Sequence, residues 1–379
     1  MSVPHKSFDV AVVGGGAIGL AIAWRAAQRG MRVGVFERGE FGAGSSRVAA
    51  GMIAPISEAR ATEQPLLELN LRSSHAYAAF VTELAETSGM NPGYIACGTV
   101  AVARDADDAE ALQRELTMRQ GLGLPVRRLL PSEARRLEPG LAPTLRLALD
   151  VPDDHAIDPR TLAPALVAAA AATGVELHTG VGVREVLSGD ERVKGLMLDD
   201  GERVVADQVV IAAGVWSDAV AGIPDEARVP VRPVKGQVMR LHDPTGPGLL
   251  TRALRIQGGF YVVPRGDGRY VLGATVEERG FDTTVTAGPL FDMLRDAIEL
   301  LPGLSELVID ELIAGLRPAT PDNAPALGPS SLRGLHWAVG HYRHGILLTP
   351  VTAEIAVAAL LGRDPPPAFS PIRFAGAVV

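Results

Sequence analysis

The chain opens with a short apolar run, a cluster of glycines and a helical pattern. Residues 8–13 (FDVAVV) predict a strand that is buried on both faces. Residues 17–29 carry apolar positions at helical spacing, and Gly30 follows them as the expected end of a helix. Residues 32–36 (RVGVF) predict a second strand, which is followed by Glu37. The pattern indicates a strand, helix and strand unit at the start of the chain.

Helical and strand-like patterns alternate along the rest of the sequence. Helices are predicted over residues 65–87, 105–120, 159–173, 289–301 and 350–361. Strands are predicted over residues 94–103, 209–214, 259–264, 270–274, 308–316 and 335–339. The run 209–214 is typical of a central parallel strand, and the alternating runs between 231 and 274 are typical of an antiparallel sheet. The basic, proline-rich stretch from residue 125 predicts connecting structure.

Two helices have clear start and stop signals. Asp158 before Pro159 predicts an N-cap followed by the first helical residue, and Thr349 before Pro350 predicts the same for the last helix. A glycine follows each of the two helices. Together the patterns predict an α/β chain of two domains (α+β in organisation). A parallel nucleotide-binding layer is assembled from separated segments, and an antiparallel sheet is interleaved between them.

Composition narrows the class of protein. The 379 residues allow two or three domains, and 47% apolar with 21% charged residues is typical of a globular enzyme. The net charge of −8 gives no general attraction for nucleic acid or an anionic membrane. The single cysteine, Cys97, excludes an internal disulfide and the usual cysteine zinc sites, so a reducing compartment is expected.

No targeting or membrane signal is recognised. Residues 1–7 lack the basic start, the apolar stretch and the cleavage site of a signal peptide. No apolar run approaches the roughly 18 residues that a membrane-spanning helix needs. We therefore expect a cytoplasmic protein that contacts neither membrane nor nucleic acid.

The glycines after the first predicted strand form a dinucleotide-binding fingerprint, Gly14-x-Gly16-x-x-Gly19. The spacing alone is expected about 0.5 times by chance in a chain this rich in glycine, so its place between a strand and a helix carries the argument. Gly14 permits the tight turn, Gly16 lets the backbone approach a pyrophosphate, and Gly19 permits close packing of helix and strand. The alternative to a dinucleotide site is an ordinary strand-turn-helix without a ligand.

Glu37 lies 18 residues beyond Gly19, at the end of the second predicted strand. A carboxylate there can bind the ribose hydroxyls of a dinucleotide and disfavours a 2′-phosphate. NADP is therefore disfavoured, whereas FAD and NAD both stay open. The alternative is an ordinary surface glutamate.

Four segments carry a resemblance to a known family. They are residues 14–30 with Glu37, SSRVAAGMIAP at 45–55, PVKGQ at 233–237, and GLRPATPDNAP at 315–325 with GHYRHGILLTP at 340–350. These segments resemble the D-amino-acid oxidase family of flavoenzymes, and within it the glycine oxidases of thiamine biosynthesis. The resemblance covers nearly the whole chain. It implies a Rossmann-like domain with non-covalent FAD over 1–90, 150–220 and 322–379, and a substrate domain, mainly an antiparallel β-sheet, over 91–149 and 221–321.

The resemblance also implies which residues contact the cofactor. Ala17 and Ile18 are expected at the phosphate turn, Glu37 and Arg38 at the adenosine ribose, Ser45 and Ser46 near the pyrophosphate, Ala50, Gly51 and Met52 beside the flavin, and Val183 at the adenine. The segment that follows the isoalloxazine ring is expected to comprise His341, Tyr342, Arg343, His344, Gly345, Ile346 and Leu347. The helix after Thr349 would direct its positive N-terminal end at this segment and stabilise anionic reduced flavin. The alternative is a plain helix packed on the core.

An acidic protein that handles amino acids needs a fixed cation for the substrate carboxylate. Arg317 is the first candidate, because a guanidinium pairs with both carboxylate oxygens, and the resemblance implies the same role. The resemblance places Arg343 near substrate and flavin and the Tyr261 hydroxyl on the carboxylate. The alternatives are surface ion pairs for the arginines and a half-buried strand position for the tyrosine.

Other polar groups are given no catalytic role. His341 and His344 have a ligand-like spacing but no carboxylate or thiolate companion, so no metal is expected. Residues 153–155 (DDH) are interpreted as a turn before the Asp158 helix. Hydride transfer from a neutral amine to flavin needs no side-chain base, so none is named.

The implied activity is oxidation of a small amino acid. Only one fingerprint is present, so a second dinucleotide is not expected and dioxygen is the simplest electron acceptor. Glycine would give glyoxylate, ammonia and hydrogen peroxide, or its imine would pass to thiazole synthase for thiamine synthesis. Gly259 and Val276 stand where bulkier or polar side chains are expected beside the substrate, so sarcosine, D-alanine and D-proline are also candidate substrates. The family suggests a homotetramer.

Three other interpretations stay open. A flavin dehydrogenase could pass electrons to a quinone or a partner protein, although no basic amphipathic membrane helix is seen. A D-amino-acid or sarcosine-type oxidase of broader range is closely related, but sarcosine oxidases usually hold flavin through a cysteine, and Cys97 lies outside the flavin motifs. A flavin-binding scaffold without turnover is the non-enzyme alternative.

Overall fold

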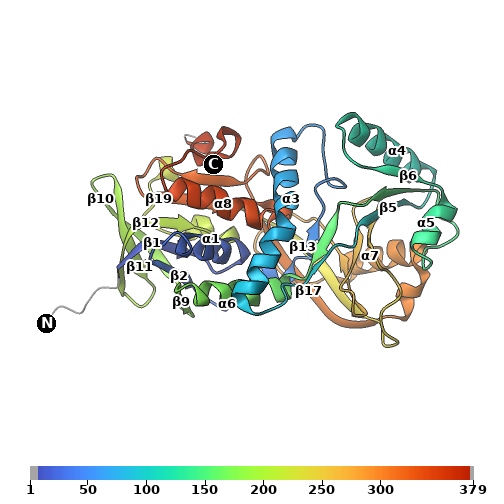
Figure 1. Cartoon of the computed structure of the whole chain (residues 1–379), viewed down its shortest axis with the longest axis horizontal. Coiled ribbons are helices and arrows are strands. Elements are labelled where there is room, and N and C mark those ends of the chain that lie inside the picture. The colour runs from blue at the N-terminus through green and yellow to red at the C-terminus, as the bar shows by residue number, and fades with distance from the viewer. Residues whose placement is uncertain (1–6, 376–379) are drawn as a thin grey trace.

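Two large sheets lie side by side in an elongated molecule (Figure 1). The computed structural model describes residues 7–375. The layer on the left of Figure 1 contains the N-terminal strand-helix-strand unit, and the middle of the chain forms most of the layer on the right. Apart from Ser7, the stretch interpreted as lacking a signal peptide lies outside the described residues.

The first sheet contains the predicted parallel layer, to which antiparallel pairs are added at the β10–β11 end and at β18. Its strand order is β10-β11-β12-β1-β2-β9, and β19 and β18 extend it from β12. The pairs β1–β12, β1–β2, β2–β9 and β12–β19 are parallel, so β12, which includes residues 209–211, is a central parallel strand as predicted. The strands are β1 (Ser7–Val13), β2 (Val33–Glu37), β9 (Glu176–Thr179), β10 (Val183–Gly189), β11 (Arg192–Leu198), β12 (Arg203–Ile211), β18 (Ala326–Pro329) and β19 (Leu335–Val339).

Side chains of β1 alternate between two apolar clusters, as expected of a strand buried on both faces. Val10 and Val12 pack among the helices, whereas Ala11 and Val13 pack on the opposite face. On the helical side, Trp24 meets Phe80 edge to face at 5.5 Å between ring centroids. The helices of this cluster are α1 (Ala17–Ala27), α3 (Gln64–Ser88), α6 (Pro159–Ala172) and α8 (Thr349–Leu360). Across residues 7–375, no helix has the length and apolar character needed to span a membrane.

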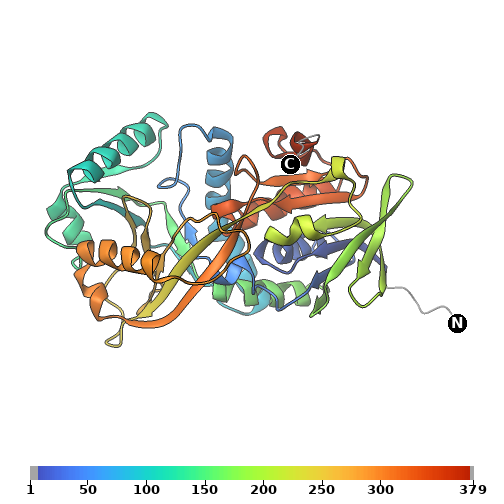
Figure 2. The ribbon, with the colours of Figure 1, turned by 180° about the vertical axis from the view of Figure 1, so that it is seen from behind.

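The second sheet has the order β17-β13-β16-β15-β14-β5-β7-β6. Only the pair β14–β5 is parallel, so the described part of the sheet is mainly antiparallel, as predicted. Figure 2 shows β13 in yellow and β17 in orange as two long paired ribbons that run toward the first layer. The strands are β5 (Thr99–Ala103), β6 (Arg127–Leu129), β7 (Leu147–Val151), β13 (Arg232–His242), β14 (Ala253–Ile256), β15 (Tyr261–Pro264), β16 (Arg269–Gly273) and β17 (Val308–Ala319).

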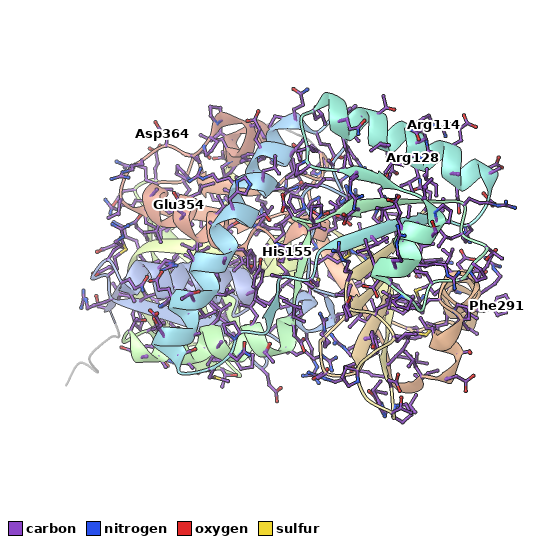
Figure 3. The ribbon with its side chains drawn as sticks, turned by 45° about the vertical axis from the view of Figure 1, so that its right-hand side comes forward. Arg114, Arg128, His155, Phe291, Glu354 and Asp364 are labelled. Carbon is purple, nitrogen blue, oxygen red and sulfur yellow. The ribbon has the colours of Figure 1, made fainter. Side chains whose placement is uncertain are left out.

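A small third sheet joins the two layers. Its order is β3-β8-β4, with β3 (Met52–Ile53), β8 (His155–Ile157) and β4 (Tyr94–Ile95). His155 therefore lies near the middle of the molecule (Figure 3). All strands of the first sheet fall within the segments predicted for the cofactor domain, but β7 crosses the predicted boundary at residues 149 and 150. The domain boundaries themselves stay a prediction.

Two stretches differ from their sequence-based expectation. The strand predicted over 94–103 is divided into β4 and β5, because Gly98 adopts a left-handed conformation (φ 71°) that an extended strand cannot contain. The stretch from residue 125 is more than connecting structure, since it forms β6 and a short helix, α5 (Pro131–Leu137). The remaining helices are α2 (Ser45–Val48), α4 (Ala106–Gly121) and α7 (Ala287–Leu300).

Residues 153–155 do not simply shape a turn, as the sequence interpretation had it. Asp154 is fully buried, and its carboxylate accepts hydrogen bonds from the backbone N–H groups of Ile56 (2.9 Å) and Ser57 (2.6 Å). Arg119 donates to the carbonyls of the same two residues, at 2.8 and 2.6 Å. One acidic and one basic side chain thus hold this loop from opposite sides.

Burial raises the pKa of Asp154 from 3.8 to about 6. Because the folded pKa lies above the unfolded one, the folded state binds the proton more tightly, so the contribution of this group to stability grows as the pH falls through 6. In Asp154→Asn this contribution is absent. As the pH falls from about 7 to about 4, we expect the unfolding free energy of the wild type, relative to that of the variant, to increase by about 1–3 kcal/mol.

The measurement is the melting temperature of wild type and variant as a function of pH. The matched control is Asp153→Asn, which neutralises the exposed neighbour of Asp154 and should leave the wild-type pH profile intact. A profile for Asp154→Asn that runs parallel to the wild type would show that this carboxyl group does not titrate differently in the folded state.

Candidate functional site

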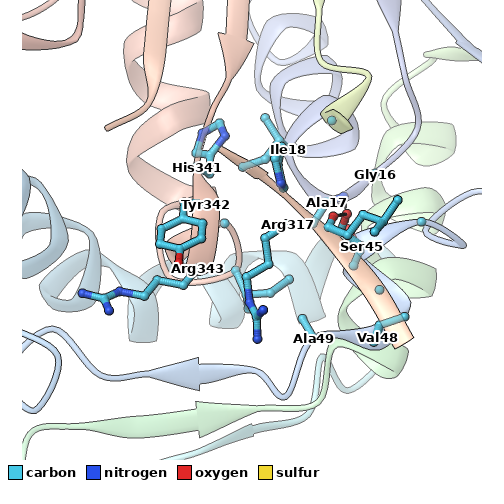
Figure 4. Close-up of a pocket in the computed structure, with 18 of the residues that line it drawn as sticks. Gly16, Ala17, Ile18, Ser45, Val48, Ala49, Arg317, His341, Tyr342 and Arg343 are labelled. Carbon is cyan, nitrogen blue, oxygen red and sulfur yellow. Dashed lines mark hydrogen bonds between the residues drawn. The ribbon is translucent and has the colours of Figure 1, made fainter. Parts of the chain in front are cut away.

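A cavity of about 820 Å³ lies between the two layers and is lined by residues of both. This volume falls in the usual range of small-molecule sites, roughly 300–1,000 Å³. All the site residues predicted from the sequence line it, with the exception of Gly19. Figure 4 shows Arg317 between the turn at Gly16 and Ala17 on one side and the turn at Tyr342 and Arg343 on the other. The cavity therefore brings together motifs that lie more than 300 residues apart in the sequence.

The phosphate turn forms one wall of the cavity. Gly14 has φ 105°, which favours glycine, and it turns the chain from β1 toward α1. A Cβ at Gly19 would lie 2.0 Å from the Gly14 carbonyl oxygen, so Gly19 permits the predicted close packing although it does not line the cavity. The N-terminus of α1 has no side-chain cap at Gly16. The turn therefore suits a pyrophosphate.

Glu37 ends β2 beside this turn. Its carboxylate accepts hydrogen bonds from the backbone N–H groups of Gly15 (2.8 Å) and Gly39 (2.9 Å). The guanidinium of Arg38 stacks over the ring of Trp216, 4.1 Å from the centroid. Glu37, Arg38 and Trp216 all line the cavity, as does Val183 at the start of β10. This end of the cavity offers an acceptor for hydroxyl groups and a flat cationic surface.

The segment after β2 passes between the two layers. The Ser45 hydroxyl donates to the Leu316 carbonyl of β17 at 2.5 Å, and the Ser46 hydroxyl accepts from the Ala17 N–H at 3.1 Å. Ser45 therefore links the layers, while Ser46 supports the phosphate turn. Ala50, Gly51 and Met52 continue along the same wall of the cavity.

Arg317 projects from β17 into the cavity without a carboxylate partner. Its Nη1 donates to the carbonyls of Lys235 (3.2 Å) and Thr275 (3.0 Å), and no carboxylate of residues 7–375 lies within 4.0 Å of its guanidinium. A Cβ at Gly236 would lie 2.4–2.6 Å from the guanidinium atoms, so only glycine leaves room for the group on β13. The charge is thus fixed in place and free to bind an anion.

Tyr261 begins β15 and also lines the cavity. Burial raises the pKa of its hydroxyl, which opposes ionisation, although the charge of Arg317 acts in the other direction. The hydroxyl therefore stays a neutral donor near Arg317. Gly259 and Val276 line the same end of the cavity, and a Cβ at Gly259 would meet no atom within 4 Å.

Arg343, unlike Arg317, has an acidic partner. Its Nε lies 3.3 Å from Glu58 Oε2 and also donates to His344 Nε2 at 3.1 Å. Burial alone would raise the pKa of Glu58, but the charge of Arg343 and then of other cations keeps it below its usual value. Arg343 therefore brings a neutralised ion pair to the cavity.

The two histidines of this turn are uncharged at neutral pH. Burial lowers the pKa of His341 to about 3 and that of His344 to about 4. His341 Nε2 bonds the Thr352 hydroxyl at 3.0 Å. Within the described part of the chain, no group of three or more His, Cys, Asp or Glu side chains is arranged to hold a metal ion.

The predicted N-cap of the last helix is wrong by one residue. Helix α8 begins at Thr349, and Leu348 occupies the N-cap position. The chain already turns helically before α8, so the Thr349 hydroxyl donates back to the Gly345 carbonyl at 2.9 Å. The N–H groups of Leu348 and Thr349 bond to carbonyls of the preceding turn, which leaves fewer free donors for a ligand than predicted.

Several lining residues were missed in the sequence, among them Glu58, Trp216, Gly236 and Arg255. Trp216 follows the central strand β12, where ligands commonly bind in α/β sheets, so its position held a usable signal. Gly236 lies inside the recognised segment PVKGQ, but its role depends on pairing with β17. Glu58 and Arg255 carry no local signal. Cys97 does not line the cavity, and burial raises the pKa of its thiol.

These residues fit a dinucleotide. The uncapped start of α1 and the glycines of its turn suit a pyrophosphate, and Glu37 suits a ribose. The cavity then continues to the second sheet, where Arg317 and Tyr261 lie. A flavin ring at that end would border an unneutralised cation.

Comparison with known proteins agrees with this geometry. The profile of the DAO family, described as FAD dependent oxidoreductase, matches residues 9–359. A glycine oxidase of Geobacillus kaustophilus (strain HTA426) is 38% identical over 359 residues, covering 94% of this chain and 93% of that protein. A bifunctional protein ThiO/ThiG of Trichormus variabilis is 33% identical over 367 residues, covering 97% of this chain but 54% of that protein.

A solved structure shows the same fold. The crystal structure of glycine oxidase from Geobacillus kaustophilus superposes with a TM-score of 0.89 at 35% sequence identity, covering 96% of this chain and 98% of the other. The family match runs from β1 into α8 and so includes every wall of the cavity. The cofactor of the family is FAD, which the predicted phosphate turn fits. The chain belongs to the DAO family of FAD-dependent oxidoreductases.

Proposed function

We propose that the chain oxidises glycine and other small amino acids, with FAD in the large cavity and dioxygen as the final electron acceptor. With a primary amino acid, each turnover would consume one amino acid, one dioxygen and one water, and release a 2-oxo acid, ammonia and hydrogen peroxide. Glycine would give glyoxylate. FAD, when bound, supplies the acceptor for the two electrons and the hydrogen of the substrate Cα–H bond.

The unneutralised guanidinium of Arg317 is the observation that carries this proposal. It is rigidly held against β13, and it lies in the cavity with Tyr261. A guanidinium with free donors binds a carboxylate in two parallel hydrogen bonds. The Tyr261 hydroxyl would add a third donor to the same carboxylate, which orients the Cα–H bond.

We assign no side-chain base among the described residues that line the cavity. Glu58 is engaged by Arg343, and the neutral imidazole of His341 is bonded to Thr352. The neutral amine of the substrate would therefore lose its Cα hydrogen without assistance from an acid or base. Binding and orientation by Arg317 and Tyr261 are the main contributions of the protein.

The substrate end of the cavity accommodates more than glycine. Gly259 has open space where a Cβ would stand, and Val276 is a small residue that is 65% exposed. A methyl group on the nitrogen or in the D-configuration at Cα could be accepted there. Sarcosine, D-alanine and D-proline are therefore proposed as further substrates.

A role in thiamine synthesis follows from the relatives. The matched part makes up 54% of the bifunctional protein ThiO/ThiG. A product that is unstable in water, such as the imine of glycine, benefits from direct transfer to the next enzyme. We propose thiazole synthase as that partner and the cytoplasm as the place of the reaction.

An oxygen-electrode screen of the purified holoenzyme tests the function. With each of glycine, sarcosine, D-alanine and D-proline, the enzyme should consume dioxygen and produce one hydrogen peroxide per dioxygen consumed. Anaerobic substrate should bleach the yellow flavin. If the flavin is bleached by substrate but no oxygen is taken up in air, the protein is a dehydrogenase and not an oxidase. If none of the amino acids bleaches the flavin, the proposed amino acid oxidation is excluded.

Arg317→Ala should raise the KM for glycine by about 100-fold or more, because two charge-assisted hydrogen bonds to the carboxylate are lost. FAD should stay bound, since the change is at the substrate end. Steady-state kinetics and the flavin absorbance of the purified variant measure the two effects. Arg363→Ala, at an exposed position after α8, is the control for loss of one positive charge. An unchanged KM in Arg317→Ala would remove the carboxylate assignment.

Gly236→Ala should displace the Arg317 guanidinium, because the added Cβ would lie 2.4–2.6 Å from it. We expect the KM for glycine to rise about tenfold while FAD affinity is unchanged. Gly121→Ala adds the same methyl group where no atom lies within 4 Å and serves as the control. The effect should disappear in the Arg317→Ala background; a full additional loss there would mean that Gly236 acts independently of Arg317.

Glu37→Ala should weaken FAD binding by about tenfold or more, because the ribose loses its acceptor and the N–H groups of Gly15 and Gly39 lose theirs. Titration of the apoprotein, followed by flavin fluorescence, measures the dissociation constant. At saturating FAD the KM for glycine should match the wild type. Glu40→Ala, at an exposed position nearby, should bind FAD normally. Equal affinity in both variants would contradict the ribose assignment.

A further inference from the structure

A second cavity, of about 380 Å³, lies between the second sheet and the N-terminal end of α6. Strands β13, β16 and β17 form one side of it, where β13 and β17 are the long ribbons of Figure 2. No residue lines both this cavity and the larger one. Its charged lining consists of four arginines and two acids: Arg160, Arg240, Arg265, Arg269, Asp310 and Glu311.

The arginines of this cavity bind the outer side of the segment that walls the large cavity. Arg240 Nη2 donates to the Arg47 carbonyl at 2.9 Å, and Arg160 Nε donates to the same carbonyl at 3.2 Å. Arg265 donates to the carbonyls of Ala50 (2.7 Å) and Ile157 (3.1 Å). These bonds explain why the guanidinium groups gather here.

Although these arginines donate to backbone carbonyls, two of their buried Nε–H groups make no hydrogen bond within the described part of the chain. The Nε atoms of Arg240 and Arg265 are buried and have no hydrogen-bond acceptor among the described residues. Arg240 Nε is 3.4 Å from Glu311 Oε2, and Arg265 Nε is 3.8 Å from Asp158 Oδ1, which are distances of an ion pair but not of a hydrogen bond with good geometry. Arg240 is 9% exposed and Arg265 is 8% exposed, so water does not freely reach them.

The carboxylates around the cavity are unevenly distributed among its arginines. Arg269 has its own partner, Asp267, at 2.8 Å. Arg160, Arg240 and Arg265 share two carboxylates, Glu311 and Asp158. Arg160 binds Glu311 at 2.5 Å. Asp158 also accepts the N-cap bond from its own helix (3.0 Å) and lies 3.7 Å from Arg269 Nη1. The remaining acid, Asp310, bonds to His242 Nδ1 at 2.6 Å. Three guanidinium groups, two of them buried, thus share two carboxylates at ion-pair distance.

The environment of Arg240 makes its charge costly. Burial lowers the pKa of Arg240 to about 10, the charges of Arg160 and Arg265 act in the same direction, and those of Asp158 and Glu311 act against it. A bound anion would offset the repulsion between the guanidinium groups and accept hydrogen bonds from the unused N–H donors. A cation would increase this repulsion, and a neutral ligand would leave it in place.

We propose that the second cavity binds a phosphate group, either free or as the ester of a small metabolite. Several guanidinium groups around one centre suit an oxyanion with oxygens in several directions, whereas a single carboxylate is satisfied by one guanidinium. The cavity volume lies at the small end of the range for small-molecule sites, roughly 300–1,000 Å³. The position of the site, behind the carbonyls of Arg47 and Ala50, puts its ligand one residue layer away from the FAD cavity.

Isothermal titration of the FAD-saturated protein with inorganic phosphate, at constant ionic strength in chloride, tests the proposal. We expect one saturable site per chain. Excess glycine should not change the affinity, because the amino acid binds in the other cavity. Glycerol 3-phosphate in a parallel titration distinguishes the two sources: binding at least as tight as that of phosphate indicates an ester, and failure of the ester alone indicates the free anion.

Arg240→Gln should weaken phosphate binding by about tenfold or more, as expected for loss of a hydrogen bond between charged groups. Because Arg240 also binds the Arg47 carbonyl, Arg269→Gln provides a second variant at a half-exposed position of the same cavity, with the same direction of effect. Arg114→Gln is the charge-matched control on α4 (Figure 3), a helix that contributes no residue to the lining of the second cavity. It should bind phosphate like the wild type.

Three results would overturn the proposal. The first is the absence of a saturable site in the wild-type holoenzyme. The second is competition of phosphate with glycine, which would place the anion at Arg317. The third is that Arg269→Gln binds phosphate with wild-type affinity, while Arg240→Gln either does the same or fails to fold.

Discussion

The structure depends on hydrogen-bond partners for the peptide groups of the segment between β2 and α3. The segment passes between the two layers, where water cannot satisfy its N–H and C=O groups. Side chains from distant parts of the chain do so instead: Asp154 and Arg119 bind opposite sides of the loop at 56–57, and Arg240 and Arg265 bind carbonyls at Arg47 and Ala50. Buried charges are therefore used here to hold backbone, and the shape of the cofactor cavity depends on them.

The two arginines of the large cavity differ in how their charges are compensated. Arg343 is half-buried and paired with Glu58, so its charge is largely compensated where it helps to shape the turn at 341–347. Arg317 donates to carbonyl oxygens, which orient the guanidinium but do not neutralise it, and no carboxylate of the described residues pairs with it. A protein with a net charge of −8 thus keeps a strong local preference for an anion at one defined point.

Local patterns predicted the parts of the fold that depend on nearby residues. The strand, glycine turn and helix at 8–29, the central strand at 209–211 and the antiparallel character of the second sheet all follow from periodicity and glycine placement. What could not be predicted depends on contacts between distant residues. Asp154 acts on residues 98 positions earlier in the chain, and Gly236 matters only because the register of β13 and β17 puts Arg317 across it. Thr349 looked like a cap because its residue type is right, but the helical turn before it was not visible in the sequence.

The interleaved order of the strands has a consequence for how the chain acquires its structure. The first sheet needs β1 from the start of the chain and β19 near its end, and the second sheet needs β5 as well as β17. The second layer cannot be finished on the ribosome before β17 is made, up to Ala319, and the first layer not before β19 is made, up to Val339. Incomplete chains would expose unpaired strand edges of the first layer, which makes premature termination more harmful here than in a protein whose domains follow one another along the gene.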